Sequence, residues 1–432
     1  MRFAAVLLFA CGCGAARKLK QRGGGFCDIS GEVQSKARCD VEMHVGELPG
    51  EVKAPRRAVC AAGGAAALVA KAAKLMRGLV YVYSTPRLDA ALAAVMENAT
   101  LAVNDENLCE VLLHRLLLTS PFRTLNGAEA KLFFFPYYGK VAHKTAINVR
   151  LEMESAAQAA LVAQPFFEEK QGVDHIIVGT SGNGLRYFSD ALQPLKHAAV
   201  AFAAENAKLA HRRNVAIPYP VQVYPNASQR WHPPRLGGNG PQDRPVSVWF
   251  QGSRGRTWNH VRNEWIGSVF GPCQNSHVQY RDKLQDFVDV MTSSYETQAK
   301  AQFCLAPRGL TPSSRRPFES LIHGCVPVIL SDNFGMPYSR WLQYEHFALR
   351  LPEKCLNATP ATARNSLRLK SRHLPDMWAA LNEVRPLFVY EHAEGSALEA
   401  IFTSLLVEVH ESPDQWNLTG LPELDAAKEC RR

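Results

Sequence analysis

The densest group of residues with chemical potential lies in one stretch of the C-terminal half, residues 306–332. A short apolar run ends at Leu305, and the helix expected over 314–323 begins just after a loop of hydroxyl and basic side chains. Free N–H groups and a positive dipole at a helix N-terminus suit a diphosphate. Arg315 and Arg316 in that first turn oppose the dipole, which suggests that an anion lies nearby. The stretch therefore predicts a site for a phosphate-bearing ligand.

Glu319 lies about one turn further along the same helix, where its carboxylate can accept hydrogen bonds from ribose hydroxyls. In open α/β sheets, ligands bind beyond the carboxyl ends of the strands, and this loop follows such an end. A competing interpretation makes Arg315 and Arg316 a solvated helix face with Glu319 as their ion-pair partner.

Elements that would position these residues recur along the chain as short apolar runs alternating with helical patterns. A Pro/Gly-rich break at residues 217–241 divides them into two sets. Strands alternating with helices imply parallel sheets buried on both faces, so the chain is expected to be α/β with two domains. Expected strands are 78–83, 131–136, 174–178, 246–250, 303–305 and 326–330, and expected helices are 104–118, 146–163, 314–323 and 375–409.

The N-terminal region indicates a secretory protein. Residues 3–16 are uncharged, end in small residues, and have basic residues on both sides, which is typical of a signal peptide. A short signal anchor is the alternative. Residues 17–77 are rich in Gly and Ala and are expected to form a stem. Glycosylation motifs agree with this compartment and begin at Asn98, Asn226, Asn357 and Asn417.

Charge and cysteines narrow the class of protein. The formal charge of +9 fits an anionic partner or basic residues spread over a solvated surface. Nucleic acid is not the expected partner, because the sequence has no zinc-finger, RRM or KH pattern and no long basic run. The 11 cysteines include no C-x-x-C pair, so a structural zinc site is not indicated. Local disulfides would be most useful in the stem, among Cys27, Cys39 and Cys60.

The run SSRRPFESLIHGCVPVILSD at residues 313–332 resembles the signature of the exostosin family of glycosyltransferases. Further matches follow in the family's order over about residues 78–409, and the ordered set is more specific than any single match. The other matching segments are Val80–Tyr83, Glu110–Tyr138, Gly172–His175, Ile217–Pro218, Phe250–Arg262 and Phe303–Pro307.

The resemblance implies a GT-B architecture, in which two Rossmann-like domains face each other across a cleft. Residues 78–235 would form the acceptor-side domain and residues 243–410 the nucleotide-sugar-binding domain, followed by a tail at 411–432. It also implies inversion at the anomeric carbon and transfer from a nucleotide sugar, usually a UDP-sugar, to a glycan.

Carried over by position, the resemblance assigns roles to individual residues. Glu319 would bind the ribose, and Arg315 or Arg316, next to Ser314, would neutralise the diphosphate. The same phosphate pocket would draw on Arg254, Arg256 and Arg262. No metal cofactor is expected, because the chain has no D-x-D triplet. Ser320 and His323 depart from the family pattern, which more often has small apolar residues there, and Pro317 is unusual within this helix.

The general base should come from the N-terminal domain. Asp174 and His175, interpreted as lying at a strand's end, are the expected catalytic pair, with Glu110 and His114 behind them. A hydrogen-bonded core role is the alternative for His175, and a packed helix position the alternative for His114.

The sequence thus predicts an inverting, metal-independent glycosyltransferase in the Golgi or secretory-pathway lumen. Its partners would be a nucleotide sugar and a glycan acceptor, and it could assemble with itself or another glycosyltransferase. Two alternatives are a non-catalytic partner subunit with the same fold and a secreted sugar-binding protein.

Overall fold

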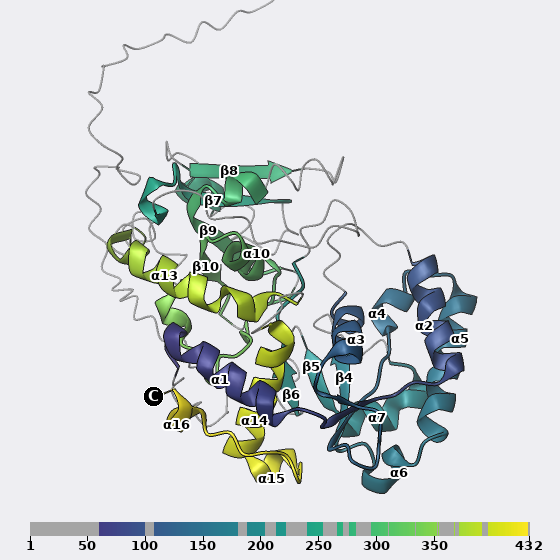
Figure 1. Ribbon diagram of the computed structural model, residues 1–432. Helices are drawn as coiled ribbons and strands as arrows, with labels where there is room; N and C mark the ends of the chain where they lie inside the picture. Colours follow the sequence, from purple (N-terminus) through teal and green to yellow (C-terminus); the bar gives the residue numbers. More distant parts are fainter. Residues whose placement is uncertain are drawn as a thin grey trace, which may run out of the picture.

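The protein folds into two lobes, each built around a parallel sheet (Figure 1). The signal segment 1–16 and the stem as far as residue 59 lie outside the described residues. The computed structural model describes residues 60–99, 108–179, 188–203, 213–221, 240–253, 266–270, 276–281, 295–309, 311–332, 334–351, 353, 367, 371–390 and 396–430.

The N-terminal lobe holds a 6-stranded sheet in the order β2-β1-β3-β4-β5-β6. Its central strands are apolar and fully buried, as expected for strands covered by helices on both faces. The strands are β1 (Val80–Val82), β2 (Arg123–Thr124), β3 (Leu132–Phe134), β4 (His175–Gly179), β5 (Val200–Ala203) and β6 (Asn214–Ala216). The helices are α2 (Pro86–Asn98), α3 (Cys109–Thr119), α4 (Gly139–Ala142), α5 (Ile147–Val162), α6 (Phe166–Lys170), η2 (Asp190–Leu192) and α7 (Gln193–Ala198).

The C-terminal lobe holds a 5-stranded sheet in the order β11-β10-β9-β7-β8. The strands are β7 (Val246–Ser253), β8 (Ser276–Arg281), β9 (Ala301–Pro307), β10 (Val326–Leu330) and β11 (Leu349–Arg350). The helices are η3 (Pro241–Asp243), α8 (Ile266–Phe270), α10 (Arg316–Ile322), η5 (Tyr344–His346), η6 (Ser371–His373), α13 (Leu374–Val384), η7 (Arg385–Phe388), α14 (Ala397–Glu411), α15 (Pro413–Trp416) and α16 (Ala426–Glu429). Two parallel sheets with helical crossovers confirm the expected α/β, Rossmann-like GT-B class.

The last part of the expected stem is instead an integral helix. Helix α1 (Ala62–Leu75) packs against α13 and α14, with Leu68 and Val69 completely buried. The Ala/Gly tract looked like a spacer, but alanine is the strongest helix former and its small side chain allows close helix packing. The globular fold therefore includes residues 60–77, and the stem boundary predicted at residue 77 is wrong.

The expected tail also belongs to the fold. Cys430, just after α16, forms a disulfide with Cys60, which lies 370 residues earlier in the sequence. Cys60 also pairs through its backbone with the chain at Trp341 and Gln343, so this end of the chain is fixed at several points. Cys60 is thus held by a long-range disulfide rather than a local one within the stem. A second disulfide joins Cys304 and Cys325.

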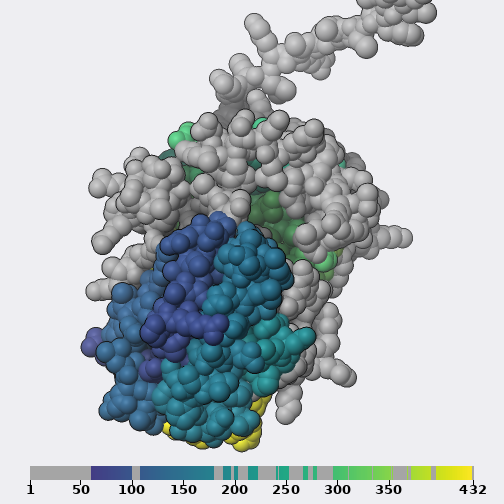
Figure 2. Space-filling view, turned by 90° about the vertical axis from the view of Figure 1, so that its right-hand side faces the viewer, coloured from purple at the N-terminus to yellow at the C-terminus, as the bar shows by residue number. Residues whose placement is uncertain are grey.

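Helix α14 connects the two lobes. Its Phe402 makes edge-on ring contacts with Phe122 and Phe202 of the N-terminal lobe, at centroid distances of 5.3 and 5.4 Å. Figure 2 shows C-terminal residues, in yellow, at the foot of the N-terminal lobe. The expected continuous helix 375–409 is divided, because Pro386 in η7 cannot continue a regular helix. The C-terminal helices therefore belong to the packing of both lobes.

None of the helices in the described part of the chain combines the length and apolar character needed to cross a membrane.

The integral position of α1 leads to a stability prediction. Leu68→Ala should lower the free energy of unfolding by about 2–5 kcal/mol, because it opens a cavity in a fully buried site. Lys74→Ala, on the exposed side of the same helix, should change it by about 0.5 kcal/mol or less. Urea unfolding of both variants measures the difference. Equal, small effects would mean that α1 is not part of the cooperative core.

Candidate functional site

The topology of the C-terminal sheet marks one place for a ligand. Strand β7 has β8 on one side and β9 on the other, so the chain order reverses between β7 and β9. In open parallel sheets, ligands bind beyond the carboxyl ends of the strands at such a switch point. Arg316, in the first turn of α10, lies over β7, with its guanidinium carbon 5.5 Å from the ring centroid of Phe250. One of the predicted phosphate ligands therefore lies at the switch point.

The loop between β9 and α10 sets the start of the helix. The Ser314 hydroxyl accepts a hydrogen bond from the backbone N–H of Arg316 at 3.3 Å. Pro317 lies in the first turn, where its missing N–H disturbs no helical hydrogen bond, so this unusual residue does not kink the helix. The Ser320 hydroxyl donates back to the carbonyl of Arg316 at 2.7 Å. Local hydrogen bonds thus fix the turn that carries Arg315 and Arg316.

Glu319 is a buried carboxylate held by two donors. The Arg315 Nε donates to Glu319 Oε1 at 2.7 Å, and the Tyr295 hydroxyl donates to the same oxygen at 3.4 Å. The Glu319 and Arg315 side chains are only 9% and 17% exposed, so the predicted ion pair exists but the solvated helix face does not. Both hydrogen bonds that described residues make to this carboxylate use Oε1. Oε2 has no hydrogen bond from the described residues.

The charge state of Glu319 follows from its neighbours. Burial raises the pKa of Glu319, and the charges of Arg315 and Arg316 more than offset this, so the net pKa lies below its ordinary value. The carboxylate is therefore ionised at neutral pH and can act only as a hydrogen-bond acceptor. The predicted diphosphate ligands, Arg315 and Arg316, and the predicted ribose ligand, Glu319, thus lie within one turn at the start of α10.

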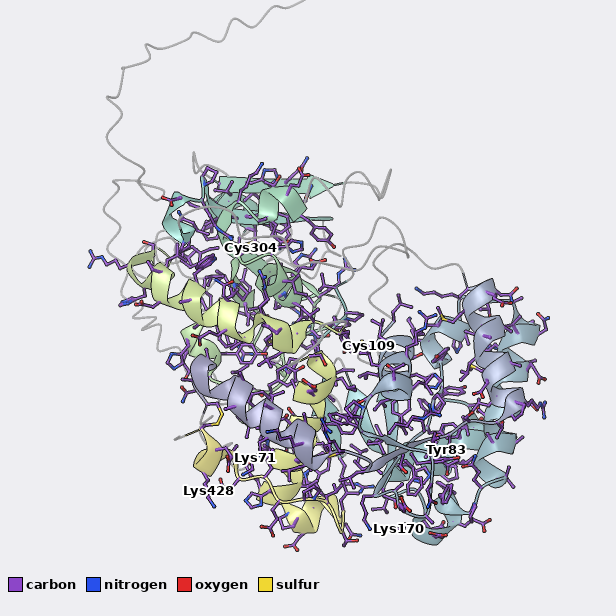
Figure 3. All side chains as sticks on the ribbon, in the orientation of Figure 1. Lys71, Tyr83, Cys109, Lys170, Cys304 and Lys428 are labelled. Carbon is purple, nitrogen blue, oxygen red and sulfur yellow. A yellow bond between two sulfur atoms is a disulfide. The ribbon has the colours of Figure 1, made fainter. Side chains whose placement is uncertain are left out.

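The two lobes meet at the carboxyl edges of their sheets. Tyr219, shortly after β6, shares a hydrogen bond of 2.9 Å with the hydroxyl of Ser313, in the loop before α10. The neighbouring carbonyl of Pro218 accepts from the Tyr390 hydroxyl at 2.7 Å and from Cys109 Sγ at 3.7 Å. Cys109 lies between the lobes in Figure 3. The N-terminus of α3 is thus close to the loop that carries the predicted phosphate ligands.

The structure does not bring Asp174 and His175 to this junction. Strand β4 begins at His175 and runs to Gly179, so the pair lies at the amino end of the strand. At about 3.3 Å per residue, the carboxyl end of the strand is roughly 13 Å further on. His175 Nε2 is 2.8 Å from the Tyr83 hydroxyl and its Nδ1 is 3.0 Å from Asp174 Oδ1. Both ring nitrogens therefore have partners, and the ring is completely buried.

Asp174 is likewise committed to the interior of the N-terminal lobe. Its Oδ2 forms an ion pair at 3.2 Å with Lys170, whose side chain is exposed, and Figure 3 places Lys170 and Tyr83 in that lobe, away from Cys109. A general base must reach the hydroxyl that it deprotonates, which this pair cannot do from the amino edge. The predicted catalytic role for Asp174 and His175 is wrong, and the hydrogen-bonded core role is correct for His175. The sequence does contain a signal for this, because Asp174 and His175 come before the apolar residues of the strand and not after them.

Glu110 and His114 lie on α3, and the two differ in position. Glu110 accepts from the backbone N–H of Lys140 at 3.2 Å, where α4 begins beyond the carboxyl end of β3. His114 Nδ1 is 2.8 Å from the Tyr138 hydroxyl, and burial lowers the pKa of His114 to about 4. Glu110 is therefore on the edge of the sheet that meets the other lobe, and His114 is a packed, neutral residue.

The remaining predicted phosphate ligands, Arg254, Arg256 and Arg262, lie outside the described residues. In the described part of the chain, no group of three or more His, Cys, Asp or Glu side chains is arranged to hold a metal ion.

Sequence reasoning missed the residues behind Glu319. Tyr295 lies 24 residues before Glu319 and has no motif around it, so only the fold brings the two together. His323 was noted as a departure from the family pattern, and the structure shows that its ring stacks on Tyr295 with centroids 4.5 Å apart.

Burial of His323 predicts a pH dependence of stability. Burial lowers the pKa of His323 from the ordinary 6.5 to about 4. Between these values the unfolded chain binds a proton that the folded protein does not, so the free energy of unfolding should fall as the pH falls from 6.5 to 4. In His323→Phe, the slope of the free energy of unfolding against pH should drop by about 1.4 kcal/mol per pH unit between pH 4 and 6.5. Urea unfolding between pH 4 and 7 measures it; an unchanged slope would contradict a neutral, buried His323.

Comparison with known proteins agrees with the fold. The family described as the Exostosin GT47 domain matches residues 75–367. The chain is 26% identical to a probable beta-1,4-xylosyltransferase, IRX10, of Arabidopsis thaliana over 57% of this chain and 61% of that protein. It is also 26% identical to a probable glucuronosyltransferase, GUT1, of Oryza sativa subsp. japonica over 56% of this chain and 60% of that protein. The chain spans about three fifths of the length of these relatives. Because the family model matches well over half of the chain, the chain belongs to the exostosin GT47 family of glycosyltransferases.

Proposed function

We propose that this chain transfers a sugar from a nucleotide sugar, of the UDP-sugar class, to a glycan acceptor with inversion at the anomeric carbon. The observation that carries the proposal is the turn of α10 at the switch point, where Arg315 pairs with the ionised, buried Glu319 and Arg316 lies over Phe250 of β7. Guanidinium groups suit a diphosphate, and a carboxylate oxygen that no described residue bonds suits the hydroxyls of a ribose. These three residues match the two parts of a nucleoside diphosphate.

Inversion in one step requires a direct displacement. The acceptor oxygen forms a new bond to the sugar's C1 while the bond from C1 to the β-phosphate oxygen breaks, and the electron pair leaves with UDP. Negative charge grows on the diphosphate as it leaves, so fixed cations beside it stabilise the transition state. Arg315 and Arg316 would supply that charge, so the reaction as proposed needs no metal ion.

The proton of the acceptor hydroxyl must go to a base on the N-terminal lobe. Glu110 is the carboxylate that we place in this role, in place of Asp174. It lies beside Cys109, which contacts Pro218 at the junction of the lobes, and next to the start of α4. The carboxyl edge of the first sheet would thus hold the acceptor, and the carboxyl edge of the second sheet would hold the donor.

Names of the relatives guide the choice of donor. IRX10 is named for xylosyl transfer and GUT1 for glucuronosyl transfer. UDP-xylose and UDP-glucuronic acid are therefore the first donors to test with this chain, and a polysaccharide is the acceptor class that we propose.

The proposed compartment is the lumen of the secretory pathway, within the Golgi. Disulfides persist in oxidising compartments, and the described residues contain two, Cys60–Cys430 and Cys304–Cys325. Two of the glycosylation motifs have exposed asparagines, Asn98 at the end of α2 and Asn417 after α15. Both features support passage through the secretory pathway.

The nucleotide site can be tested by titration with UDP. Wild-type protein should bind UDP saturably, and Glu319→Gln should weaken binding about 10-fold or more, because the charge-assisted hydrogen bonds to the ribose are lost. Glu383→Gln, an exposed position on α13, is the matched control and should leave the affinity unchanged. Isothermal titration calorimetry measures all three. A wild-type chain that binds no UDP or other nucleoside diphosphate would favour the non-catalytic partner subunit.

The general base can be tested by comparing two carboxylates. Glu110→Gln should lower kcat by about 10²–10⁴-fold and leave the affinity for UDP unchanged, since only the proton acceptor is removed. Asp174→Asn should lower the melting temperature, because it removes the charge that pairs with Lys170 and weakens the buried contact with His175, but it should leave kcat of the folded enzyme unchanged. Turnover with the active donor and thermal unfolding measure these effects. A large loss of kcat in Asp174→Asn with an unchanged kcat in Glu110→Gln would instead favour Asp174 as the general base.

A further inference from the structure

Glu319 must present one particular oxygen to the donor if it is to bind a ribose. The carboxylate of a glutamate can rotate about the bonds of its two-carbon side chain. Arg315 contacts it from one turn earlier at the start of the same helix. A contact within one helix fixes the distance between the two side chains but holds the carboxylate from one side only. A second contact, from outside α10, would define which oxygen faces the ligand.

That second contact comes from Tyr295. Its hydroxyl donates to Glu319 Oε1, the oxygen that Arg315 already uses, at 3.4 Å. Tyr295 is buried, and its phenol keeps its proton because burial and the nearby charge of Glu319 raise the pKa of Tyr295 well above its ordinary value. The hydroxyl therefore acts as a donor to the carboxylate throughout the neutral range.

His323 fixes the ring of Tyr295 and the backbone of Glu319 together. The two rings are stacked, with centroids 4.5 Å apart and planes 13° from parallel. His323 Nδ1 is 2.7 Å from the carbonyl oxygen of Glu319, which can only accept, so Nδ1 carries the proton. Glu319 is thus held at its carbonyl by His323 and at its carboxylate by Tyr295.

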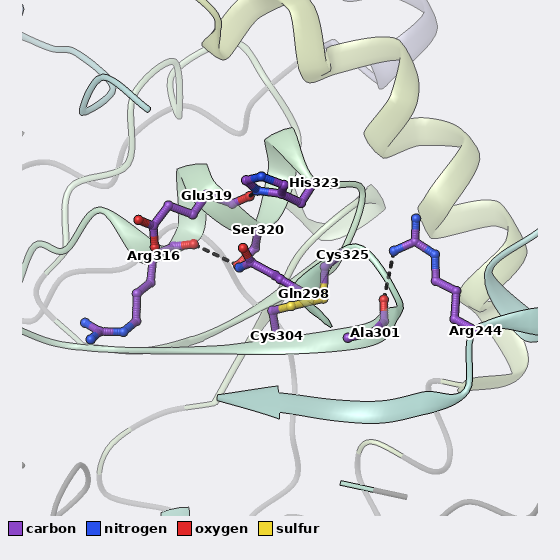
Figure 4. The surroundings of a disulfide bond; sticks show 9 residues. All are labelled: Arg244, Gln298, Ala301, Cys304, Arg316, Glu319, Ser320, His323 and Cys325. Atoms are coloured by element: carbon purple, nitrogen blue, oxygen red, sulfur yellow. Dashed lines mark hydrogen bonds between the residues drawn. A yellow bond between two sulfur atoms is a disulfide. The ribbon is translucent and has the colours of Figure 1, made fainter. Parts of the chain in front are cut away.

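The segment that carries Tyr295 has another contact with α10. Gln298 is completely buried, and its Nε2 lies 3.5 Å from the hydroxyl of Ser320, which itself donates to the carbonyl of Arg316. Figure 4 shows Gln298, Ser320 and His323 gathered on one side of α10, beside the Cys304–Cys325 disulfide. Ser320 and His323 are among the positions where the sequence was expected to depart from the family pattern, and both contact segment 295–298.

We propose that Tyr295, supported by His323, is a positioning residue for the ribose subsite: it holds Glu319 so that Oε2 faces the 2′- and 3′-hydroxyls of the donor. The inference rests on the proposed function, because it assigns the ligand of that site. Tyr295 itself touches no substrate in this arrangement; it acts through Glu319.

The test compares two probes that differ only in the ribose hydroxyls, UDP and 2′,3′-dideoxy-UDP. Wild-type protein should prefer UDP, and Tyr295→Phe should reduce the ratio of the two affinities about 3–10-fold, the effect of one hydrogen bond, while affinity for the dideoxy probe stays the same. Tyr344→Phe is the matched control. Tyr344 is also buried in the C-terminal lobe, and its hydroxyl bonds the carbonyl of Pro337 at 2.8 Å.

A second variant covers the case in which Tyr295→Phe does not fold. His323→Asn keeps a donor for the carbonyl of Glu319 but removes the ring that stacks on Tyr295, so it should also lower the preference for UDP. A wild-type ratio in the folded variants, or an equal loss of affinity for both probes, would overturn the positioning role while leaving the proposed function intact. Failure of wild-type protein to bind UDP at all would overturn the proposed function and this inference with it.

Discussion

The candidate site depends on one buried ion pair, between Arg315 and Glu319 at the start of α10. Removing a carboxylate from water costs several kcal/mol unless charge and hydrogen bonds replace the lost solvation. Arg315 and Tyr295 provide that replacement with hydrogen bonds to one oxygen of the carboxylate, and the charge of Arg316 adds to it. The surrounding framework keeps these donors in place: β9 and β10 are paired in register and joined by the Cys304–Cys325 disulfide, directly beneath the helix.

The second constraint is the way in which the chain returns to its first lobe. Helix α14 packs its Phe402 on Phe122 and Phe202 of the N-terminal lobe, while α1 closes against α13 and α14. At the carboxyl edges of the two sheets, the Tyr219–Ser313 hydrogen bond joins the loop after β6 to the loop before α10. These contacts bring the carboxyl edges of two parallel sheets together, as the proposed transfer from a donor on one lobe to an acceptor on the other would require.

How far the sequence predicted this structure depended on whether the controlling contacts were local. Strands such as 131–136 and 326–330 were predictable, because burial on both faces leaves a continuous apolar run. Helix α1 was mistaken for a stem, since it packs against helices that follow hundreds of residues later. Tyr295 gave no signal at all, because its contact with Glu319 exists only in the folded lobe. Local sequence patterns thus predicted the strands and helices. The position of α1 and the contact of Tyr295 with Glu319 depend on residues far apart in the sequence and could not be predicted from them.

The error over Asp174 and His175 shows why residue type alone is a weak guide to chemistry. Both lobes bury a carboxylate beside a histidine, a tyrosine and a cation: Asp174 with His175, Tyr83 and Lys170, and Glu319 with His323, Tyr295 and Arg315. The difference between them is strand direction. The first group lies at the amino end of β4, where the strand enters the sheet and helices close over it. In the second group, Glu319 follows the carboxyl end of β9, after the loop in which Ser313 contacts Tyr219 of the other lobe, and no described residue bonds its Oε2.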